Sequence, residues 1–455
     1  MLAAASAAYG LQTRARGVAQ RATAVGRSCR ATIFLIDVRT LPLLRARYIE
    51  KRVITFKDIE AARDRIAGAV YYSPCRPSIP LSETTGIEIF CKLDNLQRTG
   101  SFKERGARNA LVQLSPDQKK RGVIAASAGN HALGLSYQGK LLGVPVTVVM
   151  PKYAPLIKLS NCQKLGANVV LHGKDFAEAK AHAHEIADDK SLAYIDGYDD
   201  PAIIAGQGTM GLEIIEQVSD VDAVIVPVGG AGLIAGVALA VKTLRPQTKI
   251  IAVEAENAAS FSAALEAGKP TKIALHPTLA DGLAIPQVGA NAFEIAHKLV
   301  DLATIVTEEQ IAIAILRLVE LEKTVVEGAA ATPLAACLSG KLKELAAKRV
   351  VLLLCGGNID PNVLSRVIER GLVADGRLCR FTAVISDRPG GLADLASQIA
   401  STGASIKQVA HDRAFATSDV STVNVRCTVE TRNHQHLAEL CAQLKSHGVE
   451  TYDSK

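Results

Sequence analysis

A lysine in an unusual setting is the first residue whose type and position could do chemistry. In the stretch CKLDNLQRTGSFKERGARNAL, residues 91–111, Lys103 follows Ser101 and Phe102 and stands directly before a basic, glycine-containing segment that predicts a helix start. A surface lysine needs no such surroundings. A lysine amine in a partly apolar site has a lowered pKa and can attack a carbonyl group. The stretch therefore favours a lysine that forms a covalent bond.

A glycine-rich turn provides a candidate anion site. Residues 221–244, VDAVIVPVGGAGLIAGVALAVKTL, predict a buried strand that passes through the turn at 229–232 directly into a helix. Backbone N–H groups at a helix N-terminus attract phosphate, and glycines let it approach closely because they lack Cβ. The motif lacks the Gly-Lys-Ser/Thr of a P-loop. Glu254 lies near the distance at which a dinucleotide-binding turn needs an acid, so the spacing alone leaves a nicotinamide dinucleotide site open.

Two further predicted strands end in polar or glycine-rich turns. IAASAGNHALGLS, residues 124–136, places Asn130 and His131 where a strand leads into a helix, and LLLCGGNID, residues 352–360, places Cys355 at the end of an apolar run. Open α/β sheets bind ligands at the carboxyl ends of their strands, so these turns could meet at one site. A phosphate site, a polar partner for a ring substituent and a lysine amine are what pyridoxal phosphate requires. We interpret the four segments as such a pocket.

The surrounding pattern predicts an α/β core followed by a second domain. Short, β-branched, continuously apolar runs alternate with helical stretches from about Val53, as in a parallel sheet buried on both faces. The runs are GVIAAS, VPVTVVMP, ANVVLHG, DAVIVPVGG, KIIAVEAE and RVVLLLCGG. Nearer the C-terminus the order becomes βαββαβ, the arrangement of a small ferredoxin-like unit. We predict a leader at 1–52, a core at 53–370, a linker at 371–379 and a second domain at 380–455.

Composition argues against several classes of protein. The chain has 455 residues and 48% hydrophobic residues, but no apolar run long enough to cross a membrane. Residues 1–52 contribute +8 to the net charge of +7, so the remainder carries −1 and lacks the basic surface typical of nucleic-acid binding. Nine cysteines are scattered without a CxxC pair, which argues against a disulfide framework and against structural zinc.

The N-terminal segment has the composition of a targeting sequence. Its first 36 residues contain five arginines, no acidic residue and many alanines. This resembles a mitochondrial transit peptide more than a secretory signal, because no compact apolar core precedes a cleavage site. The alternative is a disordered leader. We expect a mitochondrial location if the segment is a transit peptide and a cytoplasmic one otherwise.

Taken together, the motifs resemble those of the threonine and serine dehydratases, also called threonine ammonia-lyases, of the fold-type II pyridoxal phosphate superfamily. The shared motifs GSFKERGA, SAGNHA, VGGAGL, CGGNID, MPKYAP and TLADGLA cover nearly the whole core. The resemblance implies a two-lobed α/β core with parallel sheets, in which Lys103 forms an imine with the cofactor. It implies a site in which Phe102 lies beside the pocket, Asn130 bonds the ring hydroxyl oxygen, Gly229, Gly230, Ala231, Gly232 and Leu233 bind the phosphate, Cys355 faces the ring nitrogen, and Ser127, Ala128, Gly129 and His131 contact the substrate.

Some positions depart from the family pattern. Ala231 replaces a glycine of many relatives, which is tolerable if its methyl group points outward, and Cys355 replaces a serine but is still an uncharged partner for the ring nitrogen. An uncharged partner leaves the ring a weaker electron sink, which favours prompt β-elimination. Ala128 stands where serine racemases use a serine to move a proton, so we do not expect efficient racemisation. Relatives that bind a divalent cation have acids near VEAENAAS, where this chain has Glu254 but also Ser260. The sequence leaves the metal question open.

The C-terminal residues 380–455 resemble an ACT domain, a module that usually pairs and binds an amino acid. The whole resemblance implies dehydrative deamination of L-threonine to 2-oxobutanoate and ammonia, with slower conversion of L-serine to pyruvate. It also implies an amino-acid effector, such as isoleucine or valine, and a homo-oligomer, either dimer or tetramer. Isoleucine biosynthesis and threonine catabolism are both open as its metabolic role.

Three alternative functions are also open at this point. The first is another fold-type II activity, either a serine dehydratase or racemase-like β-elimination or a β-replacement on a serine derivative. The second is a non-catalytic amino-acid sensor, against which the intact Lys103 argues. The third is a nicotinamide-dependent oxidoreductase, which predicts dinucleotide binding and no cofactor absorbance in the visible range.

Overall fold

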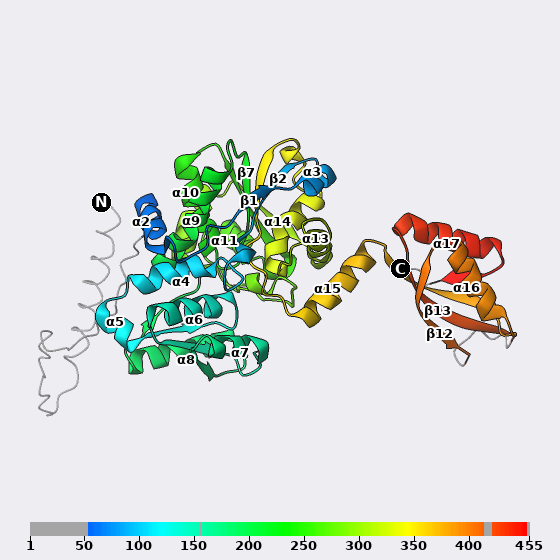
Figure 1. Cartoon of the computed structure of the whole chain (residues 1–455), viewed down its shortest axis with the longest axis horizontal. Coiled ribbons are helices and arrows are strands. Elements are labelled where there is room, and N and C mark those ends of the chain that lie inside the picture. Colours follow the sequence, from blue (N-terminus) through cyan, green and yellow to red (C-terminus); the bar gives the residue numbers. More distant parts are fainter. Residues whose placement is uncertain (1–52, 155, 414–420, 453–455) are drawn as a thin grey trace, which may run out of the picture. The chain divides into compact units, whose positions relative to one another are not determined.

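The computed structural model describes residues 53–154, 156–413 and 421–452. The predicted leader at 1–52, and with it the prediction of a transit peptide, lies outside these residues. Within the described ranges the chain forms a core with two sheets and a smaller C-terminal unit with a third sheet (Figure 1). No helix in these ranges is both long enough and apolar enough to cross a lipid bilayer.

The larger sheet of the core has six strands in the order β1-β2-β10-β7-β8-β9. These are β1 (Cys75–Pro77), β2 (Glu88–Lys92), β7 (Ala223–Pro227), β8 (Lys249–Ala255), β9 (Leu302–Val306) and β10 (Arg349–Leu353). All neighbours pair in parallel except β1, which runs antiparallel to β2. The central strands β7 and β10 are almost entirely apolar and buried, as a parallel sheet covered on both faces requires.

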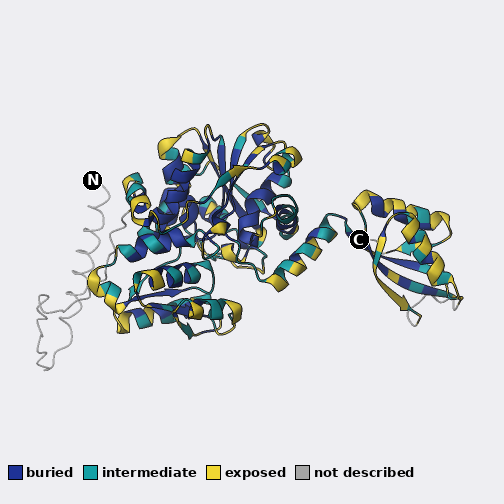
Figure 2. Ribbon diagram, in the orientation of Figure 1, coloured by how far each residue is buried: buried dark blue, intermediate teal, exposed yellow. Residues whose placement is uncertain are grey.

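Helices cover this larger sheet and build the larger lobe. They are α2 (Phe56–Ile66), α3 (Ile79–Thr85), α9 (Pro201–Gln217), α10 (Gly232–Leu244), α11 (Ser260–Ala267), α12 (Ala290–Leu299), α13 (Glu308–Leu321), α14 (Gly328–Leu338) and α15 (Pro361–Ala374). Helix α14 packs against β7, β8, β9 and β10, and α10 packs against β7, α9 and α12. Figure 2 shows that burial is concentrated in the strands of this sheet and in α9, α10 and α14.

The smaller lobe contains a four-stranded parallel sheet in the order β5-β4-β3-β6. Its strands are β3 (Val123–Ala126), β4 (Val146–Met150), β5 (Asn168–Leu171) and β6 (Ala193–Tyr194), and its helices are α4 (Lys103–Val112), α5 (Pro116–Arg121), α6 (Asn130–Leu142), α7 (Leu156–Lys164) and α8 (Phe176–Asp189). Helix α4 packs against both α6 and α9. The helix that begins at Lys103 therefore lies between the two lobes.

All six strands predicted from the apolar runs are present, but they belong to two sheets. Strands β3, β4 and β5 lie in the smaller sheet and β7, β8 and β10 in the larger one. Strand pairing is non-local, so an alternation of strands and helices does not show which strands share a sheet. The prediction missed β1, β2, β6 and β9. Strand β6 has only two residues, and β2 reads EIFCK, so neither has a long apolar run.

The C-terminal unit has the βαββαβ order predicted from the sequence. It contains β11 (Leu378–Ser386), α16 (Gly391–Ser401), β12 (Ser405–Asp412), β13 (Thr422–Glu430), α17 (His434–Ser446) and β14 (Glu450–Tyr452). Its antiparallel sheet has the order β12-β13-β11-β14, and Phe381, Ile399 and Leu440 are fully buried in its core. The predicted domain limits stay a prediction. Helix α15 extends to Ala374 and β11 begins at Leu378, so most of the predicted linker is regular structure.

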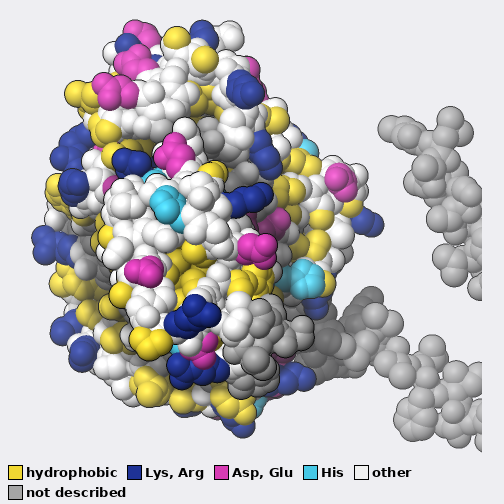
Figure 3. Space-filling view, turned by 90° about the vertical axis from the view of Figure 1, so that its right-hand side faces the viewer, with side chains coloured by type: hydrophobic (Ala, Val, Ile, Leu, Met, Phe, Trp, Pro, Cys, Tyr) yellow, Lys and Arg dark blue, Asp and Glu magenta, His cyan; other side chains and the backbone are white. Residues whose placement is uncertain are grey.

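The charged side chains visible on one face of the molecule are of both signs. In Figure 3, Lys and Arg side chains are interspersed with acidic and apolar ones. Outside residues 1–52 the sequence carries a net charge of −1. The prediction that the chain does not bind nucleic acid continues to rest on this balance of charge.

Candidate active site

A cavity of about 650 Å³ lies at the carboxyl ends of strands from both sheets of the core. The segments that follow β3, β7 and β10 all reach it, as does the start of α4. Every site residue predicted from the sequence lines this cavity: Phe102, Lys103, Ser127, Ala128, Gly129, Asn130, His131, Gly229, Gly230, Ala231, Gly232, Leu233 and Cys355. The structure thus brings together four segments that the sequence could only relate by their similar chemistry.

Lys103 is the first residue of α4 and points into the cavity from the boundary between the lobes. Its Nζ donates a hydrogen bond to the carbonyl oxygen of Gly197 over 2.6 Å and lies 5.0 Å from the centre of the Phe102 ring. Burial lowers the pKa of the Lys103 amine to about 8, and nearby Asp196 only partly offsets that effect. The neutral form of this amine is therefore far more populated near physiological pH than in an ordinary lysine, as a nucleophile or a general base requires.

The turn at 229–232 connects β7 to α10 and lies against Tyr198. A Cβ on Gly230 would lie 2.2 Å from Cγ of Tyr198, and a Cβ on Gly232 would lie 2.1 Å from the carbonyl oxygen of Tyr198. Glycine is therefore required at both positions. Ala231 has φ of 69°, in the left-handed region, and its side chain is buried in the core of the larger lobe. This conformation costs an alanine roughly 1–2 kcal/mol.

We expect Gly232→Ala to weaken cofactor binding at least tenfold. The new methyl group would meet backbone atoms of Tyr198 and not a flexible side-chain end, so the turn proposed to bind phosphate has to move. Overpacking of this kind costs roughly 1–3 kcal/mol, and about 1.4 kcal/mol corresponds to a tenfold change in Kd. Ala231→Gly in the same turn is the matched variant, because it removes the strained methyl group. Titration of both proteins with pyridoxal phosphate checks this, and equal Kd values for the two would contradict it.

A chain of side-chain amides and one carboxyl group lies on another wall of the cavity. Asn130 donates through Nδ2 to Oε1 of Glu327 over 2.7 Å, and Asn358 donates to Oδ1 of Asn130 over 2.8 Å. Burial raises the pKa of the Glu327 carboxyl to about 7, and the charge of Asp281 adds to the rise. Asn130 is thus held from both ends, and the second N–H of its amide is left to reach a ligand in the cavity.

Comparison with known proteins identifies the family to which these features belong. Residues 66–356 match the family described as pyridoxal-phosphate dependent enzyme, and residues 378–449 match the ACT domain. The chain belongs to the pyridoxal-phosphate dependent enzymes. It is 43% identical over 398 residues to an L-threonine ammonia-lyase of Thermotoga maritima, which covers 88% of this chain and 99% of the relative. An L-threonine ammonia-lyase of Geobacter sulfurreducens is 42% identical over 390 residues, covering 86% of this chain and 97% of the relative.

Solved structures show the same relationship for the core of this pyridoxal-phosphate dependent enzyme. The processed form of threonine deaminase isoform 2 from Solanum lycopersicum superposes with a TM-score of 0.66 at 38% identity, covering 69% of this chain and 91% of that one. Serine racemase from Dictyostelium discoideum superposes with a TM-score of 0.64 at 36% identity, covering 68% of this chain and 99% of that one. The predicted fold class, with a two-lobed core and a C-terminal ACT domain, is confirmed.

The cavity fits pyridoxal phosphate on its own geometry. It contains an amine of lowered pKa, a glycine turn at the N-terminus of a thirteen-residue helix, and a hydrogen-bonding amide, as the aldehyde, phosphate and ring oxygen of the cofactor require. Lys103, the turn at 229–233 and Asn130 would hold those three groups. When bound, the cofactor supplies an electron sink for the pair of electrons released at the substrate Cα.

The loop predicted to contact the substrate leads into α6. Ser127 Oγ accepts a hydrogen bond from the backbone N–H of Gly129, and α6 begins at Asn130. His131 is buried, and its Nε2 lies 3.1 Å from the carbonyl oxygen of Ile195, to which it donates. Burial lowers the pKa of His131 to about 4, so the imidazole is neutral and its donor is already used. A substrate carboxylate would therefore meet the N–H groups at the start of α6 rather than the His131 ring.

Cys355 lies two residues beyond the end of β10, a central strand of the larger sheet, and is buried beside the start of α4. Its carbonyl oxygen accepts the backbone N–H of Phe102 over 3.0 Å, which ties the lysine-bearing segment to β10. Burial raises the pKa of the Cys355 thiol well above its usual range. The side chain is thus an uncharged thiol, the property that its predicted place opposite the ring nitrogen requires.

Sequence reasoning missed several residues that line the cavity, notably Glu327, Tyr198, Lys158 and Asp281. Glu327 is the N-cap residue of α14, and an acid that directly precedes the apolar run GAAAT was the only signal for it. Tyr198 follows the two-residue strand β6, which has no clear sequence pattern. These residues reach the cavity through the packing of the two lobes.

The carboxylate of Glu254, considered for a metal site, has a local role in this structure. It is fully buried and accepts hydrogen bonds from the backbone N–H groups of Phe261 and Ser262 and from the Ser262 hydroxyl. It therefore caps the N-terminus of α11. Among the described residues, no group of three or more His, Cys, Asp or Glu side chains is placed to hold a metal ion.

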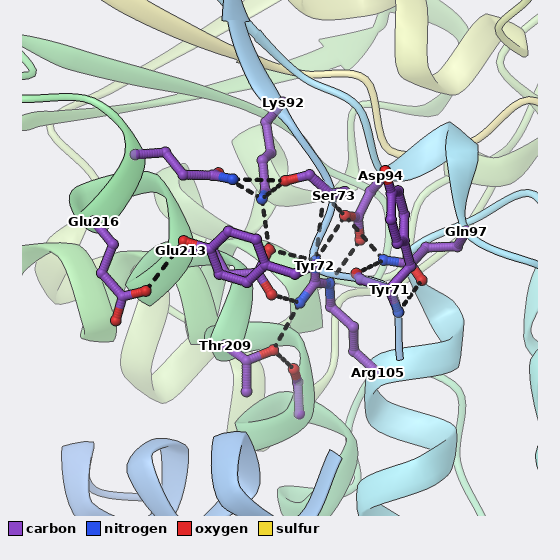
Figure 4. A network of polar contacts seen from close by, with 12 residues as sticks. Tyr71, Tyr72, Ser73, Lys92, Asp94, Gln97, Arg105, Thr209, Glu213 and Glu216 are labelled. Carbon is purple, nitrogen blue, oxygen red and sulfur yellow. Dashed lines mark hydrogen bonds and ion pairs between the residues drawn. The ribbon is translucent and has the colours of Figure 1, made fainter. Parts of the chain in front are cut away.

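A buried ion network surrounds Arg105, two residues beyond Lys103 (Figure 4). Arg105 donates through Nε and Nη2 to both oxygens of Asp94, over 2.7 and 2.8 Å, and its Nη1 and Nη2 contact Glu213. Lys92 also pairs with Glu213 and donates to the carbonyl oxygen of Ser73. Arg105, Lys92 and Asp94 are fully buried. Two cations thus balance two carboxylates and fix α4 of the smaller lobe to α9 and β2 of the larger lobe.

Proposed function

We propose that the chain catalyses the dehydrative deamination of L-threonine to 2-oxobutanoate and ammonia, with L-serine to pyruvate as the slower reaction. The observation that carries the proposal is the single cavity shared by Lys103, the turn at 229–233 and the α6 N-terminus. The names and identities of the ammonia-lyase relatives support the choice of threonine. The alignments cover 88% and 86% of this chain and nearly the whole of each relative, which favours an ammonia-lyase over other fold-type II activities.

The side chains of this chain suit each task in that reaction. The amine of Lys103 is the group placed to remove the Cα proton, since its pKa of about 8 makes the neutral form far more populated than in an ordinary lysine. The N–H groups at the start of α6 hold the substrate carboxylate and so orient the Cα–H bond. The neutral Cys355 thiol adds no charge to the site.

The test of the proposal is to mix purified, cofactor-loaded protein with L-threonine alone and to measure 2-oxobutanoate. A lyase forms the 2-oxo acid without a second substrate, whereas a β-replacement enzyme needs a nucleophile. A non-catalytic sensor binds amino acids without forming product. Formation of 2-oxobutanoate only after a nucleophile is added, or no formation at all with the cofactor bound, would rule the proposal out.

The lowered pKa of Lys103 makes a separate prediction. In protein freed of its cofactor, we expect labelling of Lys103 by a small amine-reactive reagent to be half-maximal near pH 8, since the protonated amine does not react. The rate should fall about tenfold for each pH unit below that value. An ordinary lysine has a pKa of about 10.4 and should still be mostly unreactive there. Mass spectrometry of the labelled Lys103 peptide gives the profile, and a midpoint near 10 would show that burial does not act on this amine.

We propose that an amino acid, isoleucine or valine by family analogy, binds the ACT domain and changes the activity of the core. Helix α15 supports this, because its first residues line the cavity and its last residues lead directly into β11. Allosteric coupling is typically worth roughly 1–3 kcal/mol, or 5–150-fold. Activity assays with each amino acid, on the full chain and on a chain ending before residue 376, test it. Indifference to every amino acid in both proteins would refute it.

The quaternary state and location complete the proposal. A homo-oligomer, dimer or tetramer, is expected because ACT domains usually pair. Mitochondrial import depends on the leader at 1–52, which lies outside the described residues. Light scattering of the purified protein and fluorescence imaging of the tagged full chain are the measurements that decide these two points.

A further inference from the structure

An ion pair joins the two lobes at the wall of the cavity. Lys158 lies on α7, which packs against β5 and α6 of the smaller lobe, and Asp281 begins the short helix η3 (Asp281–Leu283), which packs against α14 of the larger lobe. Lys158 Nζ donates to Oδ2 of Asp281 over 2.9 Å, and both residues line the cavity. The wall thus contains a positive charge that is already compensated by a carboxylate.

The charges that line the cavity are unequal in number. Among the described residues of its lining, the lysines and arginines are Lys103 and Lys158 alone, whereas the acids are Asp196, Asp281, Glu327 and Asp360. Lys103 has its role as the reactive amine. Lys158 is therefore the one cation in this lining that could receive a second carboxylate of a substrate, and it is held by Asp281.

Both charges of the pair act on the interior of the site. Beyond the main effect of burial, Asp281 raises the pKa of Glu327 and Lys158 lowers it. Glu327 in turn holds Asn130 through the 2.7 Å hydrogen bond. The pair is thus close enough to influence groups beside the reacting atoms, although its own side chains are 29% and 61% exposed.

We propose that the Lys158–Asp281 pair selects against substrates with a second carboxylate and so reserves the site for hydroxy amino acids with an uncharged side chain. This inference rests on the proposed function. A second carboxylate on the substrate could pair with Lys158 only by displacing Asp281, which would leave the aspartate unpaired next to the substrate. If the Lys158–Asp281 pair stays intact, the second carboxylate lies near Asp281 without a cation of its own. Either arrangement places like charges together, and such repulsion is an effective source of specificity. Threonine and serine, with neutral hydroxyl groups, meet no such opposition.

The first arm of the test measures binding without turnover. L-Aspartate and L-asparagine have nearly the same shape, differ in charge, and lack the β-hydroxyl leaving group. Their Kd values are obtained from the visible absorbance of cofactor-loaded protein during titration. In Asp281→Asn, Lys158 is released, and we expect the affinity for aspartate relative to asparagine to rise about tenfold. In Lys158→Gln the relative affinity should fall, because Asp281 is then unpaired.

The double variant and a remote control assign the effect to this pair. Lys158→Gln combined with Asp281→Asn should lose the gain of the single Asp281→Asn variant, since no cation is left to receive the second carboxylate. Asp189→Asn, at an exposed position on α8 outside the cavity lining, makes the same change in net charge and should leave the ratio unchanged. Both ion-pair positions are partly exposed, so the fold is expected to survive each change.

The second arm measures kcat/KM for L-threo-3-hydroxyaspartate and for L-threonine. The value for hydroxyaspartate divided by the value for threonine should rise about tenfold in Asp281→Asn. In the double variant this ratio should return to that of the wild-type protein. An unchanged aspartate preference in Asp281→Asn, or a gain that persists without Lys158, would overturn the inference. Failure of the wild-type protein to deaminate threonine would instead count against the proposed function. The two failures are distinguishable because the binding experiment measures selectivity without any reaction.

Discussion

Replacing Lys103 with alanine is expected to lower kcat for threonine deamination by about 10³-fold or more. A positioned general base contributes roughly 10²–10⁴-fold to the rate. Lys103, the first residue of α4, is the lysine of the described cavity lining that we propose for this role. On the proposed function, the variant would lose both the amine that attaches the cofactor and the group proposed to take the Cα proton. Formation of 2-oxobutanoate and the visible spectrum of the loaded protein measure the two losses separately.

Two controls separate chemistry from charge and from folding. Lys103→Arg keeps the positive charge but cannot lose a proton in this pH range, so it should be as inactive as the alanine variant. Addition of a small primary amine such as methylamine should restore part of the activity to Lys103→Ala and none to Lys103→Arg, where the side chain still fills the space. Retention of activity within tenfold by either variant would show that another group acts as the base.

The candidate site was predictable because its parts carry local signatures. A buried strand that passes through glycines into a helix is visible in the sequence around residues 229–232, and the strand ends near Asn130 and Cys355 have the same form. Parallel strands present their carboxyl ends at one edge, so the meeting of the segments after β7 and β10 follows from the fold class. The segment after β3 comes from the other sheet and reaches the cavity through the packing of the two lobes. The structure then adds the distances, such as the 2.6 Å between Lys103 Nζ and the Gly197 carbonyl oxygen.

The remaining site residues are a product of tertiary packing. Glu327 is distant in sequence from Asn130 and has no motif of its own, yet the two side chains are hydrogen-bonded. Lys158 and Asp281 belong to different lobes, and their pairing depends on how the lobes meet. The division of the strands between two sheets is likewise non-local. Sequence periodicity describes each element singly, so it could predict the strands and helices but not these contacts.

The predicted contact of His131 with the substrate stays a prediction, and the structure gives the ring a protein partner as well. A histidine beside a substrate loop suggests a polar contact, but its Nε2 already donates to the Ile195 carbonyl oxygen and burial lowers its pKa to about 4. The side chain therefore supports the loop from inside. The burial of the His131 ring could not be inferred from the motif SAGNHA, because the motif does not define the direction in which the ring points.

The second large effect is expected from the buried network around Arg105. We expect Arg105→Met to lower the free energy of unfolding by about 3–5 kcal/mol, the usual result of removing one partner from a buried ion pair. Glu213 still has Lys92 as a partner in the variant, whereas Asp94 has only the hydrogen bonds from Ser73 and Gln97. The cost therefore arises from one fully buried, uncompensated carboxylate. Denaturant titration of both proteins measures the difference.

Arg63→Met is the matched control for this prediction. Arg63, on α2, pairs over 3.3 Å with Glu216, which lies on α9 as Glu213 does. Both side chains of this pair are about half exposed. Exposed pairs contribute only about 0–1 kcal/mol, because water and side-chain entropy offset the attraction. Equal losses of stability in Arg63→Met and Arg105→Met would show that burial of the Arg105 network has no special importance.

The pH dependence of the Arg105→Met deficit identifies the carboxylate responsible. Burial alone would raise the pKa of Asp94, but Arg105, with smaller contributions from Lys92 and Ser73, lowers it overall in the native protein. That stabilisation is present above the unfolded pKa of about 3.9 and is lost as pH falls through the lower folded value. Without Arg105, burial raises the folded pKa of Asp94 above about 3.9, so the variant regains stability as pH falls through that raised value toward about 3.9. The native protein keeps its full stabilisation over the same range, and the deficit between native protein and variant should therefore shrink as pH is lowered from about 7 toward about 4. A deficit that stays constant over this range would mean that Asp94 is not the group left unpaired.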